Sequence, residues 1–398
     1  MKLIRRPLAK RLTWYTPEEC DVIQFGGRAV SGLAALSDEF RLGNMPTMNE
    51  VINVRVVVRG LLRRRYGRWG YYRQFLEDAH AKVVLVWHDT LVESYLLADC
   101  TDIPVFIIQN GIRHDLSPTS GKGLISSLRA IKHLHPRVTT YFALGPPAVE
   151  LLRPLVQGNF VCSGSFRLNE YVRVRSHHPQ HATDEKRVGF VVSFPNRAEV
   201  PLATLHNNPT TFMRLDERDI SYSDFYSIDG MVAAVLADVT RELDWELVII
   251  GKRSDNVLET DYFSTVPGCE GVRIVPHDKG HGYAVADSFD ALVTIDSTLG
   301  YEMLALGKKV GFVSNRLMHA GLDSSEMGFG QPVQLPADGP FWTSATTPRG
   351  IRNFLRTFLA LSEDDWSLAY TTYAPRVTSC DIGNTLLRQA IREKIAIS

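Results

Sequence analysis

Short apolar runs recur along this chain, and each is followed by a polar or glycine-containing turn and then by a segment of helical character. Buried strands of a parallel sheet have this pattern because helices cover both faces of such a sheet. In the first half the pattern predicts strands at 82–87, 103–108, 139–144 and 159–162 and helices at 49–65, 71–80, 92–99 and 148–156. Together these elements predict one doubly wound unit.

A second series of the same kind fills the other half of the chain. It predicts strands at 187–193, 246–250, 272–275, 291–295 and 309–313, an irregular stretch at 195–222, and helices at 225–243, 349–361 and 384–395. Residues 171–186 between the two series are polar and have no apolar period, which is typical of a linker. We therefore expect one domain at 1–175, a second at 186–380, and a closing C-terminal helix at 381–398.

The predicted fold class is α/β, with two doubly wound (Rossmann-like) domains that face each other across a cleft. In such folds ligands bind beyond the carboxyl ends of the strands. Chemistry-bearing residues that directly follow predicted strands are therefore the candidates for a functional site.

Composition narrows the possible partners. The chain has 398 residues, and 44 basic residues balance 44 acidic ones, so no overall positive field favours nucleic acid. The five cysteines show no CxxC spacing, which disfavours a disulfide framework and a zinc site. No apolar run has the length of a membrane span, and the basic start lacks the apolar stretch of a signal peptide. We expect a cytoplasmic protein.

The most informative motif follows the strand at 291–295 and reads Asp-Ser-Thr-Leu-Gly-Tyr-Glu from Asp296 to Glu302. Ser297 and Thr298 begin a predicted helix, where hydroxyls, free N–H groups and the helix dipole suit a phosphate or diphosphate. Glu302 lies one turn further on and can accept hydrogen bonds from sugar or ribose hydroxyls. The alternative is that the first residues merely cap the helix. Because Gly300 and Glu302 accompany them, we favour donor binding.

Three residues are candidates for the catalytic group. His88 and Asp89 directly follow the strongest strand of the first unit, where a histidine or carboxylate can take a proton or act as nucleophile. Asp89 as a helix cap and His88 as a surface histidine are the alternatives. Asp229 precedes the strand that ends at Gly251 and is kept as a reserve carboxylate, although we favour the alternative that its charge simply complements the helix dipole.

Other strand ends carry candidate binding residues. In the first unit Gln109, Asn110, Arg113 and Arg167 are expected to bind the acceptor through amide and guanidinium groups. In the second unit the expected donor-binding residues are Arg197, Gly251, Lys252, Arg253, Ser254 and His277. A cation there would stabilise a leaving phosphate without a metal, although surface ion pairing is the usual role of such residues.

The stretch from Arg55 to Arg68 carries six arginines at helical spacing, and the N-terminus adds further basic residues. On a chain of zero net charge this is a concentrated positive surface, which favours anionic lipid headgroups. The alternative is a solvated face whose arginines pair with acids elsewhere.

Several of these segments resemble a family of bacterial surface-carbohydrate biosynthesis proteins, which are predicted GT-B glycosyltransferases of capsule and O-antigen clusters. The resemblance spans most of the chain and is carried by 108–113 (IQNGIR), 164–169 (GSFRLN), 251–254 (GKRS), 295–302 (IDSTLGYE), 341–343 (FWT) and 381–384 (DIGN). The chain departs from the family at 192–197, where the family reads closer to Ser-Gln-Phe-Arg. It departs again at 87–89, where an Asp-Asn pair is more frequent.

The resemblance implies sugar transfer from a nucleotide sugar on the second domain to a lipid-linked surface polysaccharide or O-antigen acceptor on the first. Similar enzymes that transfer ulosonic acids such as Kdo hold a CMP-activated donor by Ser/Thr at a helix start, which suits Ser297 and Thr298. CMP-, UDP- and GDP-sugar enzymes of this architecture need no metal, so we expect none and no cofactor. The alternatives are a UDP-sugar 2-epimerase-like enzyme, because these share two facing domains, and a non-catalytic scaffold of polysaccharide assembly.

Overall fold

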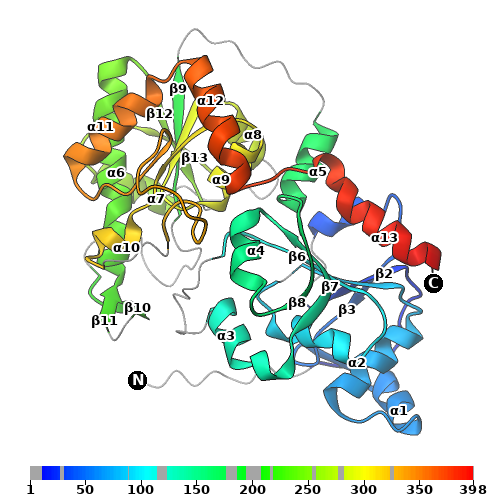
Figure 1. Ribbon diagram of the computed structural model, residues 1–398. Helices are drawn as coiled ribbons and strands as arrows, with labels where there is room; N and C mark the ends of the chain where they lie inside the picture. Colours follow the sequence, from blue (N-terminus) through cyan, green and yellow to red (C-terminus); the bar gives the residue numbers. More distant parts are fainter. Residues whose placement is uncertain are drawn as a thin grey trace.

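The computed structural model describes residues 11–26, 31–87, 89–113, 123–175, 186–193, 208–215, 218–252, 257–276, 282–322 and 327–397. Two parallel six-stranded sheets organise these residues, and helices cover both faces of each (Figure 1). The predicted class, α/β with two doubly wound domains, is confirmed.

The first sheet has the strand order β3-β2-β5-β6-β7-β8. Its strands are β2 (Val22–Phe25), β3 (Leu42–Met45), β5 (Val83–Val86), β6 (Val105–Ile108), β7 (Arg137–Ala143) and β8 (Gln157–Cys162). The α-helices of this domain are α1 (Val54–Leu62), α2 (Gly67–Asp78), α3 (Leu124–Ala130), α4 (Pro146–Leu152) and α5 (Phe166–Val174). A small parallel pair, β1 (Arg11–Thr13) with β4 (Val51–Asn53), lies beside α1.

The second sheet has the order β13-β12-β9-β14-β15-β16. Its strands are β9 (Arg187–Val191), β12 (Glu246–Gly251), β13 (Arg273–Pro276), β14 (Ala291–Thr294), β15 (Lys309–Val313) and β16 (Trp342–Thr343). The accompanying helices are α6 (Tyr222–Leu243), α7 (Val257–Ser264), α8 (Gly282–Asp287), α9 (Thr298–Ala305), α10 (Arg316–His319), α11 (Pro348–Leu359) and α12 (Glu363–Tyr373).

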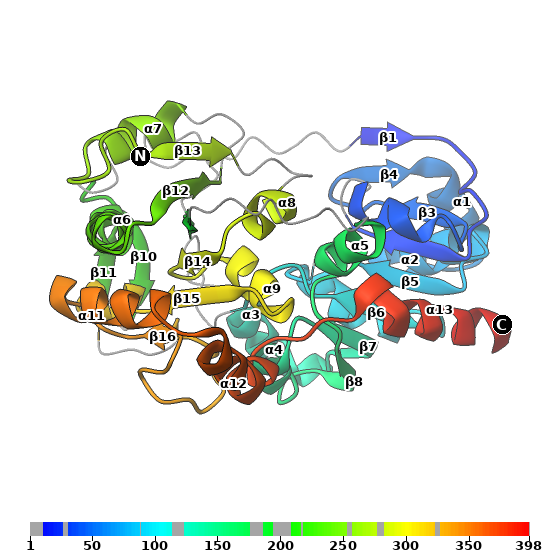
Figure 2. The ribbon, with the colours of Figure 1, turned by 90° about the horizontal axis from the view of Figure 1, so that it is seen from above.

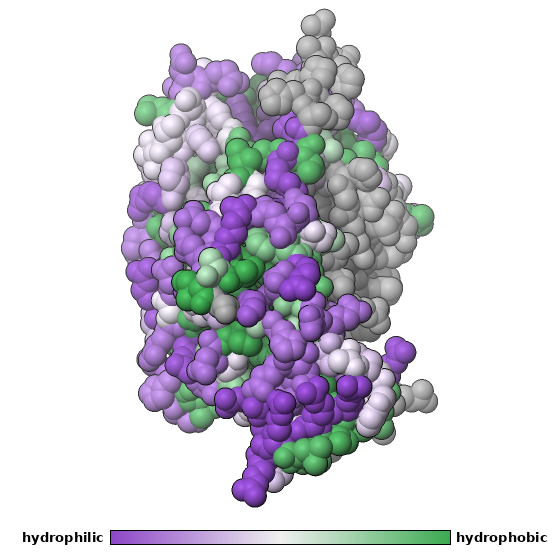
Figure 3. Space-filling model, turned by 90° about the vertical axis from the view of Figure 1, so that its right-hand side faces the viewer, coloured by the Kyte–Doolittle hydropathy of each residue, from purple (hydrophilic) through white to green (hydrophobic). Residues whose placement is uncertain are grey.

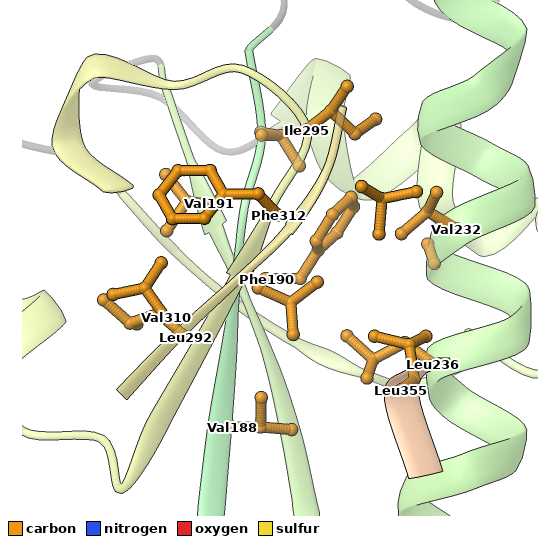
Figure 4. Packing of buried hydrophobic residues seen from close by; sticks show 14 of the residues in the cluster. Val188, Phe190, Val191, Val232, Leu236, Leu292, Ile295, Val310, Phe312 and Leu355 are labelled. Atoms are coloured by element: carbon orange, nitrogen blue, oxygen red, sulfur yellow. The ribbon is translucent and has the colours of Figure 1, made fainter. Parts of the chain in front are cut away.

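Apolar side chains fill both faces of the second sheet because its central strands are buried on each side. Phe190 of β9 points toward Val232 and Leu236 of α6, and Leu355 of α11 packs beside them (Figure 4). Phe312 of β15 belongs to the same cluster of buried residues. Continuous apolar strands of this kind are what both-sided burial requires.

The last helix, α13 (Thr385–Ile397), leaves the second domain and packs on the first (Figure 2). Its Leu387 and Ile391 join Val22 and Val83 in one apolar cluster. Arg388 is buried and pairs with Glu170 at 3.2 Å, as well as with acids of the segment 31–40. The chain therefore ties the two domains together at its C-terminal end.

Some predicted elements differ in detail. The predicted helix at 49–65 is strand β4 followed by α1, and the helix at 92–99 is a 3-10 helix. The predicted linker overlaps α5, which ends at Val174, and residues 176–185 lie outside the described part. Within the stretch predicted as irregular, β10 (Thr211–Leu215) and β11 (Arg218–Ser221) form an antiparallel hairpin. These two strands mix apolar, polar and charged residues, so the sequence contains no apolar run from which they could be predicted.

Candidate active site at the domain interface

Helix α9 begins three residues after β14 at the carboxyl edge of the second sheet, where the fold is expected to bind a ligand. Ser297 is the N-cap residue, yet its side chain makes no capping hydrogen bond. Its backbone N–H donates to the Thr294 hydroxyl at 3.3 Å, which fixes the turn to the strand. Within the described part of the chain, the hydroxyl of Ser297 and the N–H groups of Thr298 and Leu299 are therefore available to an anionic group, whereas the Gly300 N–H donates to the Ser297 carbonyl at 3.0 Å.

Gly300 brings this helix start close to the sheet. A Cβ atom at Gly300 would lie 2.6 Å from Cγ2 of Thr294 and 3.2 Å from the ring of Phe312. The residue is buried against the strands, so packing explains the glycine, and its contact with the donor stays a prediction. Its role is close packing, which sets where Ser297 stands.

Thr298 and Glu302 lie four residues apart and share a face of α9 that meets the first domain. The backbone N–H of Ile112 donates to the Thr298 hydroxyl at 3.2 Å. Glu302 accepts a hydrogen bond from Tyr283 at 3.0 Å and another from the hydroxyl of Ser165, which belongs to the first domain. One helix face thus carries both predicted donor residues and touches the predicted acceptor side.

The Glu302 carboxyl is partly buried in this contact. Burial raises its pKa to about 7, against the opposing effects of the hydrogen bonds from Ser165 and Tyr283 and of the Arg167 charge. Arg167 itself is exposed and stacks over the Trp87 ring at 5.2 Å. The sequence predicted Arg167 to be on the acceptor side. In the structure its guanidinium lies near enough to Glu302 for its charge to act on that carboxyl.

Asp89 is fully buried and anchors the loop at 109–113. It pairs with Arg113, accepts the Asn110 N–H at 3.2 Å, and accepts the Tyr141 hydroxyl at 3.0 Å. The carboxylate is saturated with donors, which is the environment of a positioning group and differs from that of an accessible base. Sequence reasoning missed Tyr141 because it lies inside β7 and away from any strand end.

The neighbouring predicted acceptor residues divide into two kinds. Gln109 is buried, and it donates to the Gly111 carbonyl at 2.8 Å and accepts the Leu144 N–H at 2.7 Å, so its amide is occupied within the fold. Arg113 also donates to the carbonyls of its own loop. Asn110 is exposed, and its side-chain amide makes no hydrogen bond to the described residues. Among Gln109, Asn110 and Arg113, the side chain of Asn110 is therefore the one available to bind a ligand, as far as the described residues show.

The reserve carboxylate Asp229 is also occupied. It is buried and pairs with Arg316 at 2.6 Å, and the same guanidinium holds Asp296 at 2.7 Å. Arg316 further stacks on the ring of Phe225 at 4.9 Å. This is the environment of a structural group, and the catalytic role of Asp229 stays a prediction. Arg316 directly follows β15 and its flanking turn, so the same strand-end criterion could have found it.

Gly251 and Lys252 end strand β12. A Cβ at Gly251 would lie 2.1 Å from a carboxylate oxygen of the buried Glu259, so glycine is required there by packing. The backbone N–H of Lys252 donates to Glu259 at 2.8 Å, and its side chain is exposed. The predicted residues His88, Arg197, Arg253, Ser254 and His277 lie outside the described residues.

A pocket lies beside the Thr298 contact and is lined by both domains. The first domain contributes Ile112 and Leu144, and the second contributes Tyr301, Gln331 and Val377. Among the described residues, no group of three or more histidine, cysteine or acidic side chains is arranged to hold a metal ion. The arrangement as a whole offers a helix start for an anion, a carboxylate for hydroxyls, and polar side chains from the opposite domain.

Comparison with known proteins gives a family and a fold. A family model described as "putative O-antigen biosynthesis protein" matches residues 106–395. No curated protein matches the chain. Among solved structures, a "putative UDP-N-acetylglucosamine 2-epimerase" from Listeria monocytogenes is 13% identical with a TM-score of 0.54, and the match covers 98% of each chain.

Two further structures are similar. S. aureus MnaA, in a co-structure with UDP, is 14% identical with a TM-score of 0.52, covering 97% of this chain and 96% of that one. Acinetobacter baumannii MurG is 10% identical with a TM-score of 0.46, covering 94% and 99%. At such identities the likeness concerns the fold, which is GT-B.

Proposed function

This chain belongs to the O-antigen biosynthesis protein family that matches it over 106–395, and from that premise we propose that it is a glycosyltransferase. The proposed reaction moves a sugar from a nucleotide sugar to a growing surface polysaccharide or lipopolysaccharide O-antigen. The second domain holds the donor, and the first holds the acceptor.

One observation carries the proposal. Ser297 occupies the N-cap of α9 without using its hydroxyl as a cap, on the helix whose Thr298 and Glu302 meet the other domain. Thr347, Ser362 and Ser221 at other helix starts do cap with their side chains. An N-cap serine normally accepts a hydrogen bond from a backbone N–H group of the first helical turn. Where it does not, a ligand oxygen can take its place as the acceptor. The phosphate of a sugar donor is such a ligand.

The proposed roles follow from this placement. Ser297 and the first turn of α9 hold the phosphate, and Glu302 accepts hydrogen bonds from ribose or sugar hydroxyls. Asn110 and Arg167 stand on the acceptor side. Because the carboxylates of Asp89 and Asp229 are occupied, His88 is the proposed catalytic base; in the sequence it comes two residues after the last residue of β5.

Donor and acceptor identities are also proposed. Our donor is a CMP-activated ulosonic acid such as Kdo, held without a metal, and our acceptor is a lipid-linked glycan at the inner face of the cytoplasmic membrane. The proposed peripheral contact with that membrane runs through 55–68 and the basic N-terminus, of which residues 1–10 lie outside the described residues. A thermal-shift screen with CMP, UDP, GDP and CDP tests the nucleotide directly.

The site is tested by nucleotide affinity in matched variants. The double variant Ser297→Ala with Thr298→Ala is expected to weaken binding about tenfold or more, because hydrogen bonds to a charged group contribute about 1.5–3 kcal/mol each. Thr347→Ala is the control, since the hydroxyl of that residue is already used to cap α11. Unchanged calorimetric affinity of the double variant for every nucleotide would refute the assignment.

A 2-epimerase-like activity is the second candidate, because the Listeria structure with a TM-score of 0.54 bears that description. An epimerase converts the nucleotide sugar without an acceptor. Incubation of the donor alone, followed by NMR of the sugar, separates the two activities: a new epimer supports this alternative, and an unchanged donor supports transfer.

A further inference from the structure

The first domain has an apolar surface at the end of α1. Leu62 is 80% exposed, Tyr66 is 68% exposed and Leu61 is 50% exposed. We call these three residues the α1 tip. Figure 3 shows a hydrophobic patch bordered by hydrophilic residues at the lower end of the molecule, where Figure 1 places α1. Large apolar side chains gathered at one protruding end need a partner, because single scattered ones are the norm on a surface.

The segment that carries this tip is rich in arginine. Residues 51–76 contain seven arginines and no acidic residue. The structure corrects the simple picture of a free basic surface, because Arg59 pairs with Asp78 at 2.9 Å and Arg68 pairs with Glu93 at 2.8 Å. Arg63, Arg65 and Arg73 share the single carboxylate of Glu77. Three guanidinium groups on one carboxylate leave the surface positively charged.

Two arginines add charge without a partner. Arg55 and Arg64 make no ion pair to any residue in the described ranges. Arg64 is exposed and directly precedes the segment that carries Tyr66. Beneath the tip, a hollow between α1 and α2 is lined by Val57, Leu61 and Arg68, among others. An apolar end with a collar of arginines and a tyrosine is the composition of a surface that enters the headgroup region of a bilayer.

We propose that the α1 tip docks the protein on an anionic lipid surface, with Leu61, Leu62 and Tyr66 entering the interface and the arginines contacting lipid phosphates. The inference rests on the membrane contact of the proposed function, but not on sugar transfer. In this proposal the membrane contact is mainly apolar, and the arginines assist it through their charge; a purely electrostatic contact is not required. A second copy of the chain is a poorer partner because a two-fold contact would bring two arginine collars together.

Vesicle flotation of the full chain tests the proposal. We expect binding to vesicles of phosphatidylcholine mixed with phosphatidylglycerol and weaker binding to phosphatidylcholine alone. Leu61→Glu with Leu62→Glu should lower binding about tenfold or more, because it removes apolar contact and adds charge that anionic lipid repels. Leu368→Glu is the matched control: Leu368 is 69% exposed on α12 of the other domain. Both substitutions are on the surface, and a thermal melt checks that the fold is kept.

The outcomes are separable. Equal flotation of the wild type and the Leu61→Glu, Leu62→Glu variant would overturn the proposal, as would an equal loss in Leu368→Glu. A wild-type dimer by light scattering that the double variant converts to a monomer, without vesicle binding, would identify a self-association surface instead. Nucleotide binding is measured in the same samples, so a failure of vesicle binding is distinguishable from a failure of the proposed transferase site.

Discussion

The Thr298 hydroxyl of the second domain accepts a hydrogen bond from the Ile112 backbone N–H of the first at 3.2 Å. Four residues later on the same helix face, Glu302 binds the Ser165 hydroxyl, also from the first domain. The helix that we propose to hold the donor phosphate is therefore also a contact between the domains. Donor binding at Ser297 and the position of the loop that carries Asn110 are linked through a single rigid element.

The buried group formed by Asp229, Arg316 and Asp296 yields the first prediction. Arg316→Met leaves the buried carboxylate of Asp229 and the partly buried carboxylate of Asp296 without their cation, so the free energy of unfolding should fall by about 3–5 kcal/mol. Urea unfolding measures the loss. Arg352→Met is the control, because Arg352 pairs with Glu242 on the surface and its removal should cost under about 1 kcal/mol. Equal losses in both variants would contradict a structural role for the buried group.

Asp89 is predicted to position the loop at 109–113 and not to transfer protons. Asp89→Asn breaks the buried pair with Arg113, and we expect unfolding free energy to fall by about 3 kcal/mol. Asp99→Asn, which affects the exposed pair with Arg137 in the same domain, should have little effect. Full stability with abolished activity in Asp89→Asn would instead make Asp89 a catalytic residue.

Much of the fold was predictable because buried parallel strands form continuous apolar runs. β5, β6 and β12 were found in this way, whereas β2 was missed because its four residues include Gln24. The short segment gives too few positions for a period to be recognised. Its place inside the sheet, next to the edge strand β3, comes from pairing with β3 and β5, which local sequence does not encode.

The candidate site was predictable in position but less so in roles. The strand-end criterion selected Ser297, Thr298 and Asp89, which come shortly after β14 and β5 in the structure, while their roles stay predictions. It could not show that the Asp89 carboxylate is filled by Arg113, since their pairing spans 24 residues and depends on how β6 lies beside β5. The role of a buried polar residue depends on such long-range partners. These partners are seen only in the structure, so the roles could not be predicted from the sequence.

Gly300 is predicted to be irreplaceable for packing. Gly300→Ala places a Cβ 2.6 Å from Thr294, so either the helix start or the strand must shift, and the loss is expected at about 1–3 kcal/mol. Because the shift moves Ser297, nucleotide affinity should fall as well. Gly60→Ala, within α1, is the control. A Cβ atom at Gly60 would have no neighbouring atom closer than 3.5 Å. Alanine in place of glycine inside a helix stabilises the helix by about 0.5–1 kcal/mol. Chemical denaturation with calorimetry measures both effects, and a Gly300→Ala variant as stable as wild type would contradict the packing role.

The carboxyl of Glu302 predicts a particular pH dependence of stability. Burial raises its pKa to about 7 from the ordinary value of 4.5, so the folded protein keeps a proton that the unfolded chain releases. The associated stability is fully present below about pH 4.5, is lost as pH rises toward 7, and changes no further above it. At about 1.4 kcal/mol per pKa unit, and with the carboxyl only partly buried, the loss is at most about 3 kcal/mol.

Glu302→Gln removes this titration while keeping hydrogen bonds to Tyr283 and Ser165. The difference in unfolding free energy between wild type and variant should therefore grow in favour of the variant as pH rises from 5 to 8. Both proteins share every other titrating group, so these contributions cancel in the difference. Glu363→Gln, on the surface of α12, controls for loss of an acidic side chain. A difference that stays constant across this range would show that the domain contact does not bury the carboxyl. If Glu302 also binds ribose, Glu302→Gln should weaken nucleotide binding at pH 8, where the carboxylate is charged, more than at pH 5.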